Sequence, residues 1–125
     1  MSNKILITGA AGFIGYHLCR SLLKDDYEVF GIDNINNYYD INLKLARLEQ
    51  LESFKNFKFE KIDIADRQSI TDSFQTYKPD IVVNLAAQAG VRYSLINPYA
   101  YMESNLVGFL NIVELCRHNN LAGLI

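Results

Sequence analysis

The sequence contains little of what marks a disulfide-bonded, metal-binding or membrane-spanning protein. Only two cysteines and two histidines occur in its 125 residues. Cys19 and Cys116 have no C-x-x-C partner, so we expect reduced thiols buried on helices rather than a disulfide. His17 and His118 are isolated from each other and from any acid-rich ligand spacing, so no metal site is expected. No apolar run approaches the roughly 20 residues that a membrane-spanning helix needs.

The sequence also has no large excess of either positive or negative charge. The formal net charge is −2 and the calculated pI is about 5.6. Lysine and arginine are dispersed, without the aromatic and basic stripe of single-stranded nucleic-acid binders, so we expect neither a nucleic-acid nor a membrane partner. A strand pattern begins almost at the first residue and leaves no room for a signal peptide, which predicts a cytoplasmic protein. The length is that of about one domain.

The most informative segment runs from Ile5 to Gly15, where an apolar strand breaks into a G-x-x-G-x-x-G turn that opens a helix. Gly9 can take a backbone conformation forbidden to other residues, Gly12 lets a ligand approach closely, and Gly15 lets the helix pack against the strand. The free N–H groups at the start of such a helix favour an anion such as pyrophosphate. The alternative is a glycine-rich turn without a ligand.

A second apolar strand, Val29 to Ile32, ends in Asp33. An acidic residue at this position can accept both ribose hydroxyls of an adenosine, which favours NAD over a cofactor carrying a 2′-phosphate. The helix between the two strands is expected to bury Ile14, Leu18 and Leu22 on one stripe.

Strand and helix patterns alternate through the rest of the chain. Further strands are expected at 57–62, as a half-exposed edge, at 81–85 and from residue 121 onward. Helices are expected after the caps Asp40, Asp66 and Asn97. The last of these helices is expected to bury Met102, Leu106, Phe109, Leu110, Val113 and Cys116.

This order predicts an α/β fold with a doubly wound parallel sheet of the Rossmann-like type, in strand order 3-2-1-4-5 with the cofactor between strands one and four. The chain stops inside the expected fifth strand, which would leave backbone groups unpaired beside strand four. We therefore expect residues 1–125 to be the N-terminal part of an NAD-binding domain, with the rest of that domain and the substrate-binding region absent.

Four segments together resemble the extended short-chain dehydrogenase/reductase family. They are the Thr8–Gly15 turn, Asp33-Asn34, Asp63-Ile64 and Asn84–Ala87. The resemblance covers the whole chain. Within the family, Ala86–Pro98 followed by Ser104-Asn105 is similar to the nucleotide-sugar 4-epimerases that act on UDP-glucuronate, including the capsular-polysaccharide epimerases.

The resemblance implies a binding site for the cofactor NAD. The implied members are Gly9, Gly12, Phe13, Ile14 and Gly15 around the pyrophosphate, Asp33, Asn34 and Asn37 at the adenosine ribose and its phosphate, Asp63 and Ile64 beside adenine, Leu85, Ala86 and Ala87 toward the nicotinamide ribose, and Asn105 near the cofactor. Three members have alternative roles: Asn37 in shaping a turn, Asp63 in capping the next segment, and Asn105 in bonding to the backbone.

Two residues after the fourth expected strand are candidates for binding the substrate, a UDP-sugar. The guanidinium of Arg92 can hold a carboxylate or a phosphate with two parallel hydrogen bonds, and it lies at the carboxyl edge of the sheet, where substrates bind. A surface pair between Arg92 and a nearby acid is the alternative. Ser94, in the same segment, is the second candidate.

The implied chemistry is reversible oxidation of the sugar C4 hydroxyl by bound NAD, followed by hydride return to the other face, which interconverts UDP-glucuronate and UDP-galacturonate. Such chemistry needs a tyrosine base in a Tyr-x-x-x-Lys arrangement. None of the eight tyrosines has a lysine four positions later. The resemblance implies that the matching Ser or Thr would fall just after Ile125. We therefore expect no catalytic residue in this chain and no activity from the chain alone.

Two other functions remain open at this point. One is a different extended family member, such as a sugar-nucleotide dehydratase or a neutral-sugar epimerase, although the segment 88–94 argues against it. The other is a non-catalytic dinucleotide-binding module. We also expect a homo-oligomer.

Overall fold

The computed structural model describes residues 3–125 and contains a five-stranded parallel sheet in the order β3-β2-β1-β4-β5. The strands are β1 (Lys4–Thr8), β2 (Glu28–Asp33), β3 (Phe57–Lys61), β4 (Ile81–Asn84) and β5 (Gly123–Leu124). The helices are α1 (Phe13–Lys24), α2 (Ile41–Glu52), α3 (Arg67–Tyr77), α4 (Pro98–Tyr101) and α5 (Phe109–His118), with a short 3-10 helix η1 (Val91–Leu95) and a π-helical segment η2 (Met102–Gly108). The doubly wound order expected from the sequence is confirmed.

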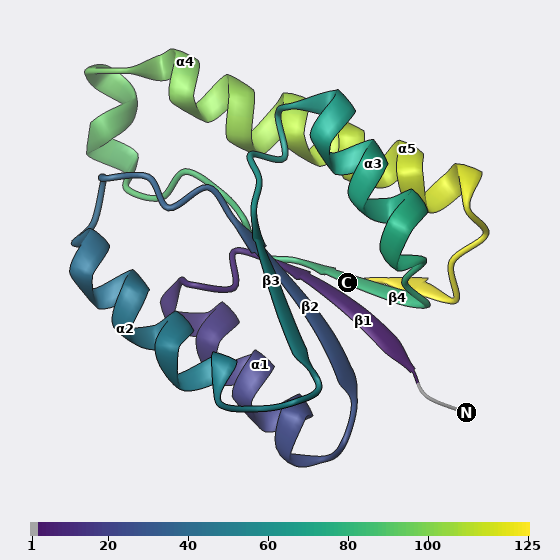
Figure 1. Cartoon of the computed structure of the whole chain (residues 1–125). Helices are drawn as coiled ribbons and strands as arrows, with labels where there is room; N and C mark the ends of the chain where they lie inside the picture. Colours follow the sequence, from purple (N-terminus) through teal and green to yellow (C-terminus); the bar gives the residue numbers. More distant parts are fainter. Residues whose placement is uncertain (1–2) are drawn as a thin grey trace.

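Helices cover both faces of the sheet (Figure 1). On β1, Ile5 and Ile7 belong to the core under α1 and α2, whereas Leu6 belongs to the core under α3 and α5. Neither Leu6 nor Ile7 is accessible to solvent. A strand covered on both faces needs apolar residues at successive positions, which explains the unbroken apolar runs of β1 and β4.

Polar caps begin three of the helices as expected. The side chain of Asp40 accepts a hydrogen bond from the N–H of Asn42, that of Asp66 from Ser69, and that of Asn97 from Ala100. No helix within residues 3–125 combines the length and apolarity needed to cross a membrane.

The buried stripe of α1 was predicted one position out of register. Ile14 is 66% exposed, and Leu18 and Leu22 are only partly buried, whereas Gly15, Cys19 and Leu23 face the sheet. The reason is the close approach of Gly15 to the turn before the helix, where a Cβ would lie 2.0 Å from the Gly9 carbonyl oxygen. This contact fixes the rotation of α1 and turns Ile14 away from the core.

The predicted buried stripe of the last helix is also wrong. Exposed residues there are Met102, Leu106, Phe109 and Leu110, while Val113 and Cys116 are partly buried. The buried positions are instead Gly108 and Ile112. Gly108 lies close against Ile64 and Ile112 belongs to the core under α3, so the helix turns these positions inward rather than the predicted stripe.

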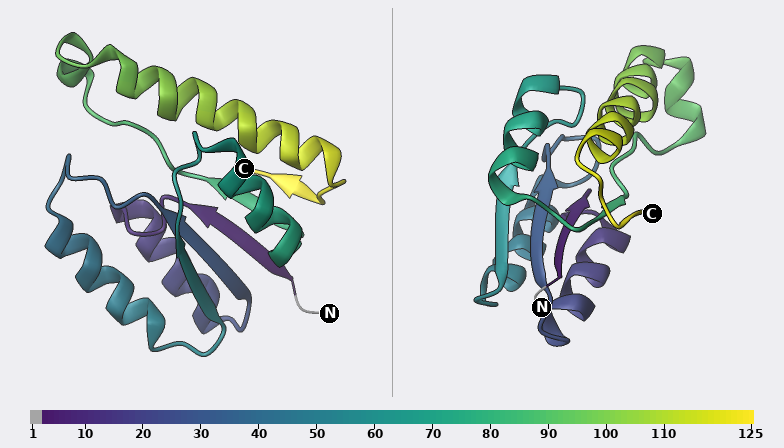
Figure 2. Two further views of the ribbon diagram at one scale, coloured as in Figure 1. Left: turned by 45° about the horizontal axis from the view of Figure 1, so that its top comes forward. Right: turned by 90° about the vertical axis from the view of Figure 1, so that its right-hand side faces the viewer.

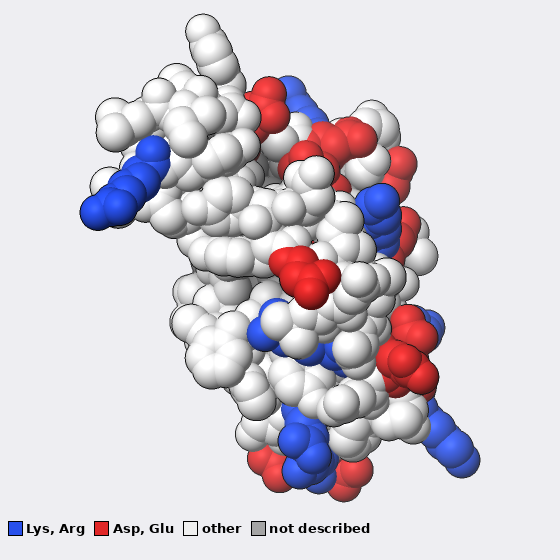
Figure 3. Space-filling model, turned by 90° about the vertical axis from the view of Figure 1, so that its left-hand side faces the viewer, with Lys and Arg blue, Asp and Glu red and all other residues white. Residues whose placement is uncertain are grey.

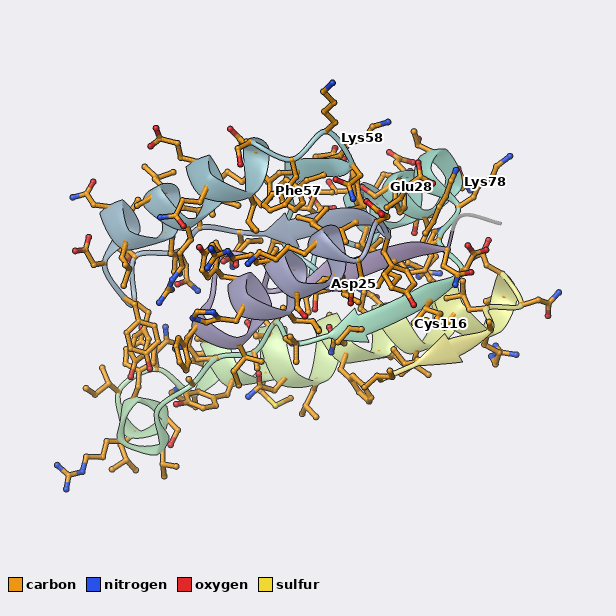
Figure 4. The ribbon with its side chains drawn as sticks, turned by 90° about the horizontal axis from the view of Figure 1, so that it is seen from below. Asp25, Glu28, Phe57, Lys58, Lys78 and Cys116 are labelled. Carbon is orange, nitrogen blue, oxygen red and sulfur yellow. The ribbon has the colours of Figure 1, made fainter. Side chains whose placement is uncertain are left out.

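The segment 98–118 runs as one continuous rod along the side of the sheet (Figure 2). Gly108 sets its distance from the core, because a Cβ there would lie 2.5 Å from Cγ1 of Ile64. Both cysteines lie on helices as expected; Cys19 is buried and Cys116, near β5, is partly buried (Figure 4).

Candidate cofactor site

The turn between β1 and α1 has the backbone that its glycines predict. Gly9 has a φ of +72°, in the left-handed region that disfavours side chains, and the N–H of Gly12 donates to the Gly9 carbonyl over 3.0 Å. A Cβ on Gly9 would lie 3.0 Å from the backbone nitrogen of Ala86. The turn therefore packs directly on the segment that follows β4.

The start of α1 leaves backbone donors available. Gly12 provides no side-chain cap, and the first helical bond runs from the N–H of Tyr16 to the Gly12 carbonyl over 2.9 Å. The N–H groups of the α1 residues before Tyr16 have no intrahelical acceptor, and they lie at the positive end of the helix dipole. Such a helix end is suited to an anion.

Asp33 connects the end of β2 to this turn. One carboxylate oxygen accepts from the N–H of Ala11 at 3.1 Å, and the other accepts from Ile35 at 2.8 Å. An ionised carboxylate has about four acceptor positions, so both oxygens can still accept bonds from ligand hydroxyls. On the outer side of the turn, Arg47 of α2 donates to the Ala11 carbonyl over 3.0 Å.

Thr8 joins β1 to the end of β4, a role that was not predicted from the sequence. Its buried hydroxyl oxygen accepts from the N–H groups of Leu85 and Ala86, each over 2.9 Å, and its hydroxyl donates to the side chain of Asn84 over 2.6 Å. Thr8 and Asn84 are register partners in β1 and β4. The sequence contains one signal for this role, because each of the two apolar strands ends in a polar residue.

A cavity of about 320 Å³ lies at the carboxyl ends of β1, β2, β3 and β4. It is lined by twelve of the fourteen cofactor residues expected from the sequence: Gly9, Gly12, Phe13, Ile14, Gly15, Asp33, Asn34, Asp63, Ile64, Leu85, Ala86 and Ala87. The cavity volume falls at the lower end of the range typical for ligand pockets. Figure 3 shows the end of the molecule where the loops after these strands lie, and uncharged residues make up most of that surface.

The other two expected residues lie outside the cavity lining. Asn37 is exposed on the loop before α2. Asn105 in η2 bonds to both main-chain groups of Gln88, accepting from its N–H at 2.8 Å and donating to its carbonyl at 3.3 Å. Asp63 lines the cavity and also accepts from the N–H of Ala65 at 3.0 Å, a local backbone bond like that of the capping role considered for it.

Further lining residues were not predicted from the sequence. They are Ile32, Asn36, Tyr38, Tyr39, Lys44, Ile62, Gln88, Ala89 and Ser104. Lys44 could have been predicted as a candidate site residue from the sequence, because it shares the buried face of α2 with Leu48 and Leu51. A lysine in an otherwise apolar stripe is unusual.

An aromatic cluster joins the loop before α2 to the segment after β4. The rings of Tyr38 and Tyr93 have centroids 4.7 Å apart, and the hydroxyl of Tyr101 donates to the Ala89 carbonyl over 2.9 Å. Tyr38 also fills the space beside Gly90, whose φ is +88°. These contacts hold the two loops together beside the cavity.

The candidate substrate residues lie on η1, away from the cavity lining. Ser94 donates to the Val91 carbonyl over 2.6 Å. Arg92 is exposed and makes no ion pair with any acid among residues 3–125. The same described part of the chain contains no group of three or more histidine, cysteine or acidic side chains placed to hold a metal ion.

A parallel sheet in this order, with a glycine turn after its first strand and a carboxylate at the end of its second, has the Rossmann-like fold of extended short-chain dehydrogenases/reductases. The chain belongs to the family described as GDP-mannose 4,6 dehydratase, whose model matches residues 6–124.

Several relatives are closely similar to this chain. Protein CapI of Staphylococcus aureus is 50% identical over 122 residues, and a UDP-glucuronate 4-epimerase of Thermodesulfobacterium geofontis is 46% identical over 120 residues. These matches cover 98% and 96% of this chain but only 36% and 37% of the relatives. The chain therefore spans little more than a third of their length.

A solved structure is similar in both sequence and fold. The UDP-glucuronic acid 4-epimerase of Bacillus cereus, in complex with UDP-glucuronic acid and NAD, is 37% identical, with a TM-score of 0.87. The match covers 97% of this chain and 38% of that protein.

Proposed function

We propose that this chain is the N-terminal, NAD-binding part of a nucleotide-sugar 4-epimerase that interconverts UDP-glucuronate and UDP-galacturonate. The observation that carries the proposal is one cavity lined by both the glycine turn and Asp33. Similarity to an epimerase solved with NAD and UDP-glucuronic acid supports the choice of cofactor and sugar. When bound, NAD supplies the hydride acceptor for the sugar C4 position, and the residues of this chain bind and orient it.

Each expected cofactor residue has a role in this proposal. The first turn of α1, with Gly12 before it, would bind the pyrophosphate, and Asp33 would accept the adenosine ribose hydroxyls. Around them, Phe13, Ile14 and Gly15 would border the pyrophosphate, Asn34 and Asn37 the ribose and its phosphate, Asp63 and Ile64 the adenine, and Leu85, Ala86 and Ala87 the nicotinamide ribose. Asn105 would act through the main chain of Gln88, which it holds at the cavity wall.

The exposed segment η1 would contribute to substrate binding. Arg92 has no intramolecular ion pair within residues 3–125, so its guanidinium is available for the carboxylate or a phosphate of a UDP-sugar. Ser94 lies two residues further along the same short helix.

Titration calorimetry with NAD tests the cofactor assignment. Replacing Asp33 with alanine removes an acceptor for the ribose and should weaken NAD binding by about 1–3 kcal/mol, or roughly 5- to 150-fold. Asp72→Ala, on the exposed surface of α3, is the matched control and should bind NAD as the parent does. Equal affinity in the parent and the Asp33 variant would refute the assignment.

Asp33 also holds the N–H of Ala11, so the variant could lose binding because the turn loosens. Asp33→Asn keeps the side-chain shape and one acceptor oxygen while removing the charge. Thermal unfolding of all three variants separates a lost ligand contact from a lost turn. The assignment requires weaker binding by a variant that still unfolds near the parent temperature.

A further inference from the structure

Lys44 is a buried cation at the cavity wall. It lies in the first turn of α2, only 7% of its surface is exposed, and its side chain lines the cavity. Its ammonium group donates to the backbone carbonyl of Asn36 over 2.9 Å and to the side-chain oxygen of Asn36 over 3.0 Å. Both acceptors are neutral, so neither balances the charge.

No carboxylate within residues 3–125 forms an ion pair with Lys44. Burying an ammonium group without a counter-charge is costly, and buried charges are normally paired. An ammonium has three N–H donors, and Asn36 uses two of them. One donor and the whole positive charge are therefore available to an anion in the cavity.

We propose that Lys44 binds a phosphoryl group attached to the adenosine ribose of the ligand. The inference rests on the proposed dinucleotide site and adds a residue that recognises one of its phosphates. Asn36, which holds Lys44, is three residues from Asp33, the proposed ribose acceptor, and all three residues line the same cavity. The carboxylate of Asp33 would repel a phosphate at the 2′ position, so the 5′-phosphate is the expected partner.

The competing role is purely structural, with Lys44 tethering the loop that contains Asn36. If Lys44 were only a tether, replacing it would change the binding of every ligand of the cavity to the same extent. A phosphate-binding residue would affect phosphorylated ligands alone. The test therefore compares adenosine, 5′-AMP, 2′-AMP and NAD on the same variants, with binding followed by chemical-shift titration of the 125-residue chain.

Lys44→Gln should weaken binding of 5′-AMP and NAD by about tenfold or more and leave adenosine unchanged, since hydrogen bonds to charged groups contribute about 1.5–3 kcal/mol. Lys44→Arg keeps the charge and should recover part of the affinity. Lys58→Gln is the control, because Lys58 points into solvent from β3 (Figure 4). It should bind all four ligands as the parent does.

Three results would overturn the inference. If Lys44→Gln weakened the binding of adenosine and 5′-AMP equally, Lys44 would have only the structural role. If it left the binding of every ligand unchanged, Lys44 would not belong to the site. If Lys44→Gln weakened the binding of 2′-AMP alone, the assignment of Lys44 to the 5′-phosphate would be refuted. In each case the parent still binds NAD, so the proposed function survives; failure of the parent to bind NAD would overturn both.

Discussion

Replacing Gly15 with alanine tests whether the glycine turn and α1 are as closely packed as the structure shows. In most helices this change is favourable by about 0.5–1 kcal/mol, because alanine has the higher helix propensity. Here the new Cβ would lie 2.0 Å from the carbonyl oxygen of Gly9 and 2.8 Å from its carbonyl carbon. We expect the sign of the effect to reverse.

The size of the effect follows from the atoms that collide. Ordinary contacts begin near 3.4 Å, so α1 or the turn must move by roughly 1 Å or more, and backbone atoms cannot rotate away as a side chain can. Overpacking of this kind costs about 1–3 kcal/mol and occasionally more. After the propensity gain is subtracted, we expect a net loss of about 1–2 kcal/mol in the free energy of unfolding.

Urea unfolding followed by circular dichroism measures this difference. Gly123→Ala is the matched control, because nothing lies within 4 Å of its added Cβ, and it should change stability by no more than about 0.5 kcal/mol. A Gly15→Ala variant with no cooperative transition would agree with the prediction. A variant as stable as the parent would refute the close packing of α1 on the turn.

Three further predictions concern activity, association and reactivity. The chain alone should form no UDP-galacturonate from UDP-glucuronate and NAD, because none of its tyrosines is followed by lysine at the fourth position; product above a no-protein control in chromatography would contradict this. The exposed apolar side chains of Met102, Leu106, Phe109 and Leu110 should cause self-association, seen by light scattering as a mass that rises with concentration, and a constant monomer mass would refute it. Burial raises the pKa of the Cys19 thiol to about 12, so on the order of one molecule in ten thousand carries the reactive thiolate at pH 8. Ellman's reagent should therefore label Cys19 rapidly only in the unfolded chain, with a native rate that increases with pH, and fast native labelling at pH 8 would show that the thiol is accessible.

Element type and order were largely predictable because strands such as β1 and β4 are short apolar runs and several helices begin at a polar cap. Asp40 and Asp66 act as the caps that their positions predict, since a cap depends only on residues two or three positions away. Buried faces were less predictable. The rotation of α1 depends on a backbone contact of Gly15, and that of the last helix depends on the close approach of Gly108 to Ile64. Neither contact leaves a periodic signal in the sequence.

The same distinction applies to the candidate site. The glycine turn and Asp33 lie at strand ends, so strand order alone brings them together at one edge of the sheet. Asn36, Lys44 and Ser104 reach the cavity from a loop and two helices whose placement depends on tertiary packing. Asn105 illustrates the limit, because its sequence position agreed with two roles and only the structure shows its bonds to Gln88.

The hydrogen bond between Asp33 and Ala11 has a consequence for the energetics of binding. Because the carboxylate already restrains the glycine turn, the conformational entropy of that turn is lost during folding rather than during ligand association. Arg47 restrains the same turn from the opposite side. The glycine turn is therefore preorganised by contacts within the chain, and ordering it adds no entropic cost to an association at this edge of the sheet.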